Sequence, residues 1–378
     1  MKTEPPTCSV HPSFLSPHPS SPFSGSYDPA DVTFLLKPVR LAPTDVAEKE
    51  RLIQSGRRHY SEMISAERLP SAAYLDVFHR ALPRVRARFA RDVLALAARL
   101  AERPGGVTLV SLARAGTPVG VLLARALRGV FGVPAAHYSV SIIRDRGIDE
   151  VALRFILDRH PAASVAFVDG WTGKGVIARE LSAAVAAFNA RTGAGLDGGL
   201  YAVADLCGAA AAAATGDDYL IPSAVLGATV SGLVSRSILN ADVVGPGDFH
   251  GCLYYEEFAP HDLSRGFVDD ISAEIVRQAK TFTPPPPPDL AGLRRASAAF
   301  LAAVRDRAGV RDPNHVKPGL GEATRVLLRR VPDRLIVRDP HAPDVEHLLV
   351  LAREKAVPTE TDPALPYAAA ALIKELDG

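Results

Sequence analysis

The pattern of hydrophobic and polar positions divides the chain into a helical part and a longer part in which strands alternate with helices. Apolar residues recur at three- and four-residue spacing over residues 48–55 and 72–103, and this period predicts two helices. From Val107 onward, short apolar runs are separated by amphipathic stretches. Strands that alternate with helices are typical of a parallel sheet covered on both faces. The predicted strands are residues 107–113, 137–143, 164–170 and 199–206.

Proline-rich segments mark the domain boundaries. Residues 1–26 hold prolines, serines and histidines without periodicity, and such a segment cannot bury enough apolar area to stay ordered. Five consecutive prolines at 284–288 predict a stiff, extended spacer. We therefore predict a disordered tail, an α/β domain with a parallel sheet, a proline-rich linker with a helix, and a small C-terminal α/β domain. Their predicted boundaries are 1–26, 27–280, 281–312 and 313–378.

Composition narrows the class of protein. The 378 residues are 47% hydrophobic and 22% charged, which excludes collagen-like and wholly disordered chains. A formal net charge of +1 gives no overall field for nucleic acid or membranes. Cys8, Cys207 and Cys252 are too few for a disulfide framework and form no CxxC pair, which indicates a reducing compartment without structural zinc. No apolar stretch approaches the roughly 20 residues that span a bilayer and no secretory signal is recognisable, so we expect a cytoplasmic protein without membrane contact.

The strongest chemical signal is the segment 165–176, in which an apolar strand ends near Asp169 and opens into a glycine-rich turn before a helix. Backbone amides and the amino end of a helix bind phosphate, and a carboxylate at the strand end can bind hydroxyl groups. A Walker loop is the obvious competitor. However, only two residues separate Gly170 from Gly173-Lys174, and Gly175 stands where that motif needs a hydroxyl. A tight turn that uses glycine only for space is the structural alternative.

At this segment the chain resembles the type I phosphoribosyltransferases. The resemblance implies a fold of that type, in which Asp169 binds the ribose of phosphoribosyl pyrophosphate and the following loop binds its 5-phosphate. The family has two adjacent acids, whereas Gly170 follows Asp169 here, and the loop of the family is longer. The remaining residues of the implied phosphate site are Thr172, Gly173, Lys174 and Gly175.

Two further loops fit the same resemblance. The turn after the first predicted strand holds an arginine, a glycine and a hydroxyl, which together can neutralise a leaving oxyanion, and it corresponds to the pyrophosphate loop of the family. Arg144 and Arg146 lie where the family has a flexible closing loop, although a solvated surface turn explains them as well. The implied reaction uses Mg²⁺ held through the substrate phosphates, so no metal cluster of protein ligands is expected. The pyrophosphate turn comprises Arg114, Ala115, Gly116 and Thr117.

A closer resemblance covers nearly the whole predicted ordered chain. The stretches TLVSLARAGTPVGVLLARAL, FVDGWTGKGVI and DFHGCLYYEEF look like the phosphoribosyltransferase-domain proteins of tellurite-resistance operons, a family that carries the label "cysteine protease StiP". The stretch NHVKPGLGEATRVLLRRVPDRLIVRD is similar to the Pelota-type RNA-binding module. The resemblance implies a nucleotide-like metabolite, a role in stress resistance, and operon partners such as an ATP-grasp ligase.

The protease label requires a thiol with a nearby base and an oxyanion hole. His250 precedes Cys252 by two residues, so the two side chains would share a face of a strand simply by alternation. Neither the sequence around Cys252 nor that around Cys207 is a local protease signature. We therefore expect buried structural thiols and keep catalysis by Cys252 as an alternative.

Other polar groups are weaker candidates. His59 and Glu62 are three residues apart, so on a helix they would share a face and pair with each other or meet a substrate. Ser231, Ser235 and Arg236 fit an anion site or a lid, and equally a hydrogen-bonded structural segment. The acids at 217–218 would supply the second carboxylate that the segment around Asp169 lacks.

The C-terminal domain combines a strand predicted at 335–339 and a helix predicted at 347–357 with a local excess of basic residues. Concentrated positive charge suits a nucleic-acid backbone, although a solvated face is the alternative because few aromatic residues are available for base stacking. The residues predicted to bind RNA are Lys317, Arg325, Arg329 and Arg330.

These expectations combine into one leading hypothesis and two alternatives. The leading hypothesis is a Mg²⁺-dependent phosphoribosyltransferase that acts on phosphoribosyl pyrophosphate or a related ribose phosphate and carries an RNA-binding module. The first alternative is a non-catalytic regulator that binds a nucleotide and RNA, which the missing second acid favours. The second is a cysteine hydrolase. A homo-oligomer is compatible with each of them.

Overall fold

The computed structural model describes residues 21–308 and 312–375, and most of the predicted tail, including Cys8, lies outside these ranges. Its centre is a mostly parallel sheet with the strand order β1-β4-β3-β6-β7-β8, and the short β5 pairs antiparallel with β4. The α/β class predicted from the sequence is therefore confirmed. The strands are β1 (Thr33–Leu35), β3 (Val107–Ala113), β4 (Ala135–Ile143), β5 (Gly147–Ile148), β6 (Val165–Thr172), β7 (Leu200–Asp205) and β8 (Ala212–Thr215).

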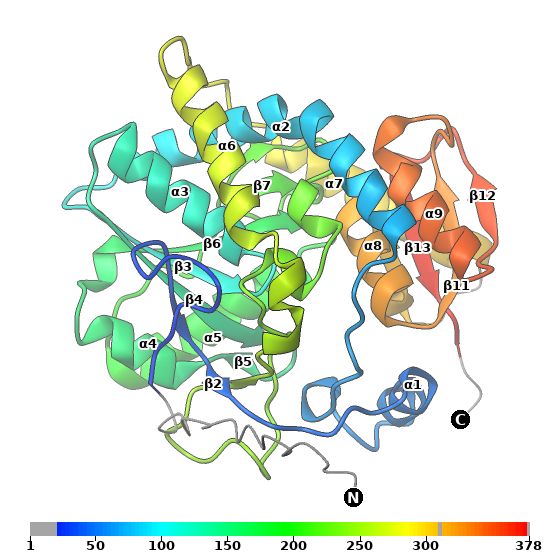
Figure 1. The fold of residues 1–378 in the computed structure, drawn as a ribbon, viewed down its shortest axis with the longest axis horizontal. Coiled ribbons are helices and arrows are strands. Elements are labelled where there is room, and N and C mark those ends of the chain that lie inside the picture. The colour runs from blue at the N-terminus through cyan, green and yellow to red at the C-terminus, as the bar shows by residue number, and fades with distance from the viewer. Residues whose placement is uncertain (1–20, 309–311, 376–378) are drawn as a thin grey trace, which may run out of the picture.

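Helices cover both faces of this sheet (Figure 1). On one face, α2 (Ala72–Ala101), α3 (Thr117–Gly129) and α6 (Ser264–Ala279) pack against one another and share the largest buried apolar cluster. On the other face, α4 (Glu150–Leu157) and α5 (Val176–Thr192) form a second cluster with the strands. Because both faces are covered, the strands read as continuous apolar runs in the sequence.

The third predicted strand is longer than the sequence pattern indicated. It was expected to end at Gly170, but β6 continues through Trp171 and Thr172, because Trp171 pairs with Ala204 and Thr172 with Asp205 of β7. The glycine-rich turn therefore consists only of residues 173–175. The pattern also missed β8, which consists of three alanines and a threonine and so gives a weak apolar signal.

A second unit follows the prolines at 284–288. It packs a four-stranded sheet of order β10-β13-β11-β12 against two helices. The helix Leu320–Arg329 was not recognised from the sequence. It carries two of the four residues predicted to bind RNA, Arg325 and Arg329, and Arg330 directly follows it. The elements are α7 (Leu290–Ala308), β10 (Val316–Pro318), α8 (Leu320–Arg329), β11 (Pro332–Val337), α9 (Glu346–Glu354), β12 (Thr359–Thr361) and β13 (Ala369–Ile373).

The two units are in close contact at the carboxyl end of β6. A Cβ atom on Gly321 of α8 would lie 2.3 Å from the Trp171 ring, and one on Gly173 would lie 2.7 Å from the carbonyl oxygen of Pro318. Both positions therefore require glycine. Asp218 strengthens the junction, because its carboxylate accepts hydrogen bonds from the backbone N–H groups of Leu320 and Ala368 at 3.0 and 2.8 Å.

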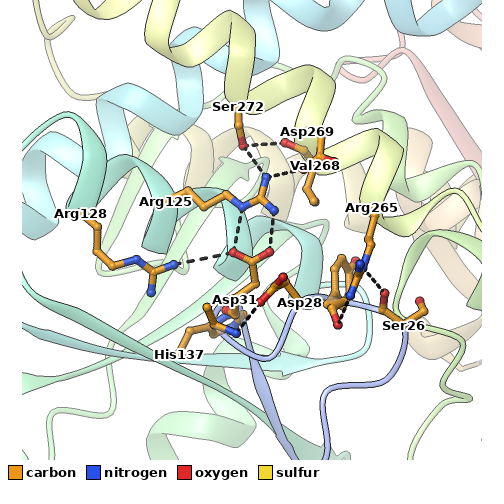
Figure 2. Close-up of polar contacts among 12 residues, drawn as sticks. Ser26, Asp28, Asp31, Arg125, Arg128, His137, Arg265, Val268, Asp269 and Ser272 are labelled. Atoms are coloured by element: carbon orange, nitrogen blue, oxygen red, sulfur yellow. Dashed lines mark hydrogen bonds and ion pairs between the residues drawn. The ribbon is translucent and has the colours of Figure 1, made fainter.

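Ion pairs hold the N-terminal segment against the helical face (Figure 2). Arg125 of α3 donates from Nε and Nη2 to the two carboxylate oxygens of the buried Asp31, and from Nη1 to Asp269 of α6. His137 of β4 contacts the carbonyl oxygen of Asp31 at 2.8 Å. This network orients β1 at the edge of the sheet and is distant in sequence from the glycine-rich turn.

Three short elements complete the chain. The helix α1 (Val46–Gln54) lies beside the C-terminal unit in Figure 1, and Arg330 joins the two through Glu50. The strands β2 (Lys37–Pro38) and β9 (Gly251–Cys252) form a parallel pair apart from the central sheet. Within the described ranges, no helix has both the length and the apolar character needed to cross a bilayer.

Candidate functional site

A pocket of about 220 Å³ lies where β6, the start of α5 and the C-terminal unit meet. We call it the loop pocket, because the turn 173–175 forms one of its walls. Gly175 has a φ of 71°, in the left-handed region that favours glycine, and precedes α5 without a side-chain cap. The open amino end of α5 therefore borders the pocket, and such ends attract anions. The lining includes Tyr60, Arg144, Asp169, Trp171, Thr172, Lys174, Lys317, Glu322, Arg325 and Arg330.

Two lysines from different units face this pocket. Lys174 donates to the carbonyl oxygen of Pro313, and burial, followed by repulsion from Lys317, lowers its pKa to about 7. Burial likewise lowers the pKa of Lys317 on β10. A bound anion would relieve both effects, because it favours the charged form of each ammonium group. Together with Arg144 and Arg325, the lysines make basic side chains more numerous than carboxylates in the lining.

Asp169 is the acid at this strand end, as the sequence suggested. Its side chain is buried, and Oδ1 accepts a hydrogen bond from the N–H of Gly170 at 2.7 Å. Burial raises the pKa of Asp169 to about 6, and attraction to Arg325 opposes this rise only in part. Thr172 closes the turn, because its Oγ1 accepts from the N–H of Gly175 at 3.1 Å.

The residues predicted to bind RNA converge on the junction between the two units. Arg325 lies over the Trp171 ring, 4.5 Å from its centroid, and donates to Glu322 at 2.7 Å. Arg330 reaches the buried Glu50 through two hydrogen bonds of 2.6 Å each. Lys317 lines the loop pocket, and Arg329 lines two neighbouring cavities.

The loop after β3 contrasts with the glycine-rich turn, because protein contacts occupy its polar groups. Arg114 is buried; it donates to the carbonyl oxygen of Val234 at 2.7 Å and to Glu67 at 2.8 Å. Thr117 is fully buried and shares a hydrogen bond of 2.7 Å with Ser139.

The glycine of the same loop serves packing. A Cβ on Gly116 would lie 2.9 Å from the carbonyl oxygen of Leu112 and 3.0 Å from that of Val168, so the position needs a glycine to let the backbone segments approach. Ala115 contributes to the lining of a smaller pocket, of about 190 Å³, at the ends of β3, β4 and β6. This strand-end pocket and the loop pocket share the residues Tyr60, Asp169, Trp171, Ile177 and Arg325.

The structure separates the two arginines of the predicted closing loop. Arg144 lines the loop pocket, and its N–H donates to the Tyr60 hydroxyl at 2.8 Å. Arg146 instead pairs with Glu62 at 3.0 Å. The predicted pair of His59 and Glu62 is wrong, because only a short turn of helix forms here and His59 starts it, with Nδ1 2.8 Å from the Ser61 hydroxyl.

The remaining weak candidates have structural partners. Ser235 donates from Oγ to the carbonyl oxygen of Arg236 and accepts from the N–H of Leu253, so its hydroxyl holds a backbone segment together. Asp217 pairs with Arg88 at 2.6 Å. Asp218 caps α8, and burial raises its pKa to about 6. The proposed second carboxylate is therefore engaged in the contact between the units.

Neither described thiol has the surroundings of a nucleophile. Cys252 is fully buried, and burial raises its pKa to about 12. Burial and the carboxylate of Asp205 raise the pKa of Cys207 to about 12, and its Sγ lies 3.4 Å from Asp205 and 3.8 Å from Thr172. His250 does not activate Cys252; its Nδ1 contacts the Ser141 hydroxyl at 2.8 Å. In the described part of the chain, no three His, Cys, Asp or Glu side chains converge as metal ligands.

Comparison with known proteins identifies the family. Residues 25–272 match the family model described as "Tellurite-like stress resistance cysteine protease StiP". The chain belongs to the StiP family. It is 40% identical over 379 aligned residues to "Cysteine protease StiP" of Acinetobacter baylyi, covering 94% of this chain and 95% of that protein. Residues 295–375 match the PELOTA RNA binding domain, and no solved structure matches the chain.

Membership of the StiP family corrects the predicted activity. The resemblance around Asp169 predicted a phosphoribosyltransferase, whereas the family model and the Acinetobacter relative are both named as a cysteine protease. The physical source of the error is visible in the loop after β3. Its composition suits a pyrophosphate site. However, Arg114 already donates hydrogen bonds to Glu67 and to the carbonyl oxygen of Val234, and the Thr117 hydroxyl is bonded to that of Ser139.

Several lining residues escaped the sequence analysis of this StiP-family chain. Trp171 was expected in a loop, although a tryptophan within a Gly-Trp-Thr-Gly segment indicates a close contact with another part of the chain. Tyr60 and Glu322 come from segments distant in sequence from β6. The fold of the first unit brings Tyr60 to the pocket, and the docking of the C-terminal unit brings Glu322. The expected Mg²⁺ stays a prediction.

Proposed function

We propose that this StiP-family chain is a regulator in tellurite-like stress resistance that binds a phosphorylated, nucleotide-like ligand in the loop pocket and RNA through its Pelota-type domain. The observation that carries the proposal is the convergence of the open amino end of α5 with Lys174 and Lys317. Crowded ammonium groups and free helix N–H groups both gain from a phosphate. The ligand would bind without being turned over.

The surroundings of the loop pocket support a nucleotide-like molecule rather than phosphate alone. The loop pocket of about 220 Å³ and the strand-end pocket of about 190 Å³ have five residues in common, so a ligand can extend from one into the other. Tyr60 and Trp171 line both pockets; Arg325 and α8 cover the Trp171 ring, so Tyr60 is the more accessible aromatic side chain. Asp169 can accept a hydrogen bond from a sugar hydroxyl when its carboxyl group is ionised.

The same residues couple the ligand to RNA binding. Lys317 and Arg325 belong to the segment matched by the RNA-binding family, and both line the loop pocket. A bound phosphate therefore draws on the charge that an RNA backbone would use. We expect ligand and RNA to weaken each other's binding, as two ligands of linked sites must do reciprocally.

Calorimetric titration of the full chain tests the ligand site. We expect AMP and ribose 5-phosphate to bind, and adenosine, which lacks the phosphate, to bind at least tenfold more weakly. Lys174→Ala should lose at least tenfold in affinity for both phosphorylated compounds, whereas the exposed Lys280→Ala should not. Repeating the titrations with Mg²⁺ shows whether the ion accompanies the phosphate.

Equal binding of AMP and adenosine, or an unchanged affinity in Lys174→Ala, would refute the ligand site. The RNA part has a separate readout, the retention of a fluorescein-labelled oligoribonucleotide pool with and without saturating AMP. Retention that ignores AMP would contradict the shared use of Lys317 and Arg325 but leave the ligand site intact.

A thiol hydrolase is the second candidate, because the family and the Acinetobacter relative carry that name. Of the two described thiols, Cys207 lies nearer the candidate site, since its Sγ is 3.8 Å from the Thr172 hydroxyl. Its raised pKa and its carboxylate neighbour oppose a thiolate, so the geometry favours the binding function. Hydrolysis of casein that Cys207→Ala or Cys8→Ala abolishes would instead support the hydrolase.

A further inference from the structure

A second, larger cavity opens between the helical face and the C-terminal unit; it adjoins the strand-end pocket and lies outside the loop pocket that holds the phosphate in the proposed function. It has a volume of about 770 Å³ and is lined by residues 43–46 and 64–71, by the turn 225–229, and by the ends of α8 and α9. We call it the arginine cavity, because Arg114, Arg236 and Arg329 all line it. Basic side chains outnumber carboxylates in the lining.

The charges in the arginine cavity are unequally compensated. Glu67 neutralises Arg114 at 2.8 Å and also accepts from the N–H of Ala228 at 2.7 Å, so its carboxylate is fully engaged. Arg236 donates only to backbone carbonyl oxygens, those of Met63 and Ser237. Within the described ranges, no hydrogen bond or ion pair engages the Arg329 guanidinium.

A guanidinium left without a partner in a cavity is costly. Burial, followed by repulsion from Arg114, lowers the pKa of Arg329 to about 9. The Arg329 side chain is half-buried, and N–H donors that face a cavity without an acceptor lose hydration without a replacement. A protein keeps such a group most readily where a ligand supplies the acceptor, and Arg suits the paired oxygens of a carboxylate or phosphate.

Buried hydroxyls in the same lining also lack partners. Thr229 is 3% exposed, and its Oγ1 makes no hydrogen bond in the described structure. The Ser65 hydroxyl, which likewise lines the cavity, has none either. Buried polar atoms are nearly always paired, so unpaired donors beside an unpaired cation point to a ligand with acceptor oxygens.

We propose that the arginine cavity binds an organic anion, whose carboxylate or phosphate group accepts from Arg329 and Arg236 and whose body is apolar. The apolar part of the lining, which includes Ile64, Leu226, Phe258 and Leu351, faces the same space. Its volume of about 770 Å³ accommodates a molecule much larger than an inorganic ion. Neither Lys174 nor Lys317 of the loop pocket lines this cavity, whereas Arg236 and Arg329 also line the adjoining strand-end pocket.

Titration of the full chain with octanoate and octyl phosphate tests the proposal, and comparison of the two shows which head group fits better. We expect at least one of them to bind, and 1-octanol, which has the same body without charge, to bind at least tenfold more weakly. Arg329→Met should lose at least tenfold in affinity for the anion. The exposed Arg353→Met controls for net charge, and Lys174→Ala, in the loop pocket, should bind the anion as the wild type does.

The unfolding temperature supplies a second readout. Without ligand, Arg329→Met should unfold at a slightly higher temperature than the wild type, because it removes a half-buried charge that repels Arg114 and keeps the aliphatic bulk. Absence of binding by the wild type, equal binding by Arg329→Met, or a large fall in its unfolding temperature would each overturn the assignment. Loss of anion binding in Lys174→Ala would mean that the anion occupies the loop pocket instead.

Discussion

The loops after β3 and β6 have similar compositions, but their polar groups differ in whether protein contacts already engage them. Each follows a buried parallel strand, contains glycine, adjoins a threonine, and carries a basic residue that the sequence assigned to an anion. After β3, Glu67 neutralises Arg114 and Ser139 binds Thr117. After β6, Lys174 lines a pocket with the open end of α5. Only the second loop keeps its charge available to a ligand.

The difference shows that loop composition does not determine whether a polar group is available. Arg114 becomes structural because Glu67, 47 residues earlier in the chain, reaches it within the fold. Lys174 stays available because it donates to a neutral carbonyl oxygen, that of Pro313, and because repulsion by Lys317 exceeds the attraction of any one nearby carboxylate. The partner, rather than the residue itself, therefore decides between a structural and a ligand-binding role.

The largest expected effect is a difference in the free energy of unfolding between a variant at the loop after β3 and one at the loop after β6. Glu67→Ala leaves the buried Arg114 without its carboxylate, and breaking such a pair from one side costs about 3–5 kcal/mol. Lys174→Ala removes a crowded ammonium group, so we expect its free energy of unfolding to change by less than about 1 kcal/mol. Urea denaturation of both variants measures the contrast. Equal destabilisation by the two substitutions would remove the distinction between a structural and an open loop.

The sequence was sufficient for the parts of the fold that local patterns encode. The run from Val107 to Ala113 was predicted to the residue, because a continuous apolar strand between glycines has sharp ends. The start of α8 at Leu320 was missed, because Gly319 and Gly321 lower the helical propensity there. Asp218 caps this helix from the other unit, which no local pattern can reveal.

Only the part of the candidate site that β6 and its following turn contribute was predictable from the sequence. Asp169 and Lys174 follow from the strand-turn-helix pattern around them, and both line the pocket. Lys317 and Arg325 were recognised as basic but assigned to an RNA surface, because the contact between the units is not encoded locally. Tyr60 escaped notice for a different reason: it lies in the same unit but reaches the pocket from a short turn before α2, far from β6 in the sequence.

The pH dependence of anion binding tests whether the loop after β6 is open to a ligand. The pKa of Lys174 is lowered to about 7 and that of Asp169 is raised to about 6. From pH 6 to pH 8 the lysine loses its positive charge and the aspartate completes its ionisation, so both changes disfavour an anion. Sulfate, whose charge is constant over this range, should therefore bind roughly tenfold more weakly at pH 8.

Lys174→Ala is the control for the pH series, because it removes the group with the larger effect. Its sulfate affinity should be weak and should change much less between pH 6 and pH 8. Tighter sulfate binding by the wild type at pH 8 than at pH 6 would contradict the assignment of Lys174 to the anion.

The smallest expected effect comes from removing one hydroxyl in each loop. Thr117→Val leaves the buried Ser139 hydroxyl without its partner and should cost about 1 kcal/mol in the free energy of unfolding, without changing affinity for AMP. Thr172→Val removes the acceptor for the Gly175 N–H, which shapes the turn at the amino end of α5. It should therefore weaken AMP binding several-fold and change stability no more than Thr117→Val does. If Thr117→Val weakened AMP binding as much as Thr172→Val, the loop after β3 would belong to the ligand site, and its internal contacts would have to open for the ligand.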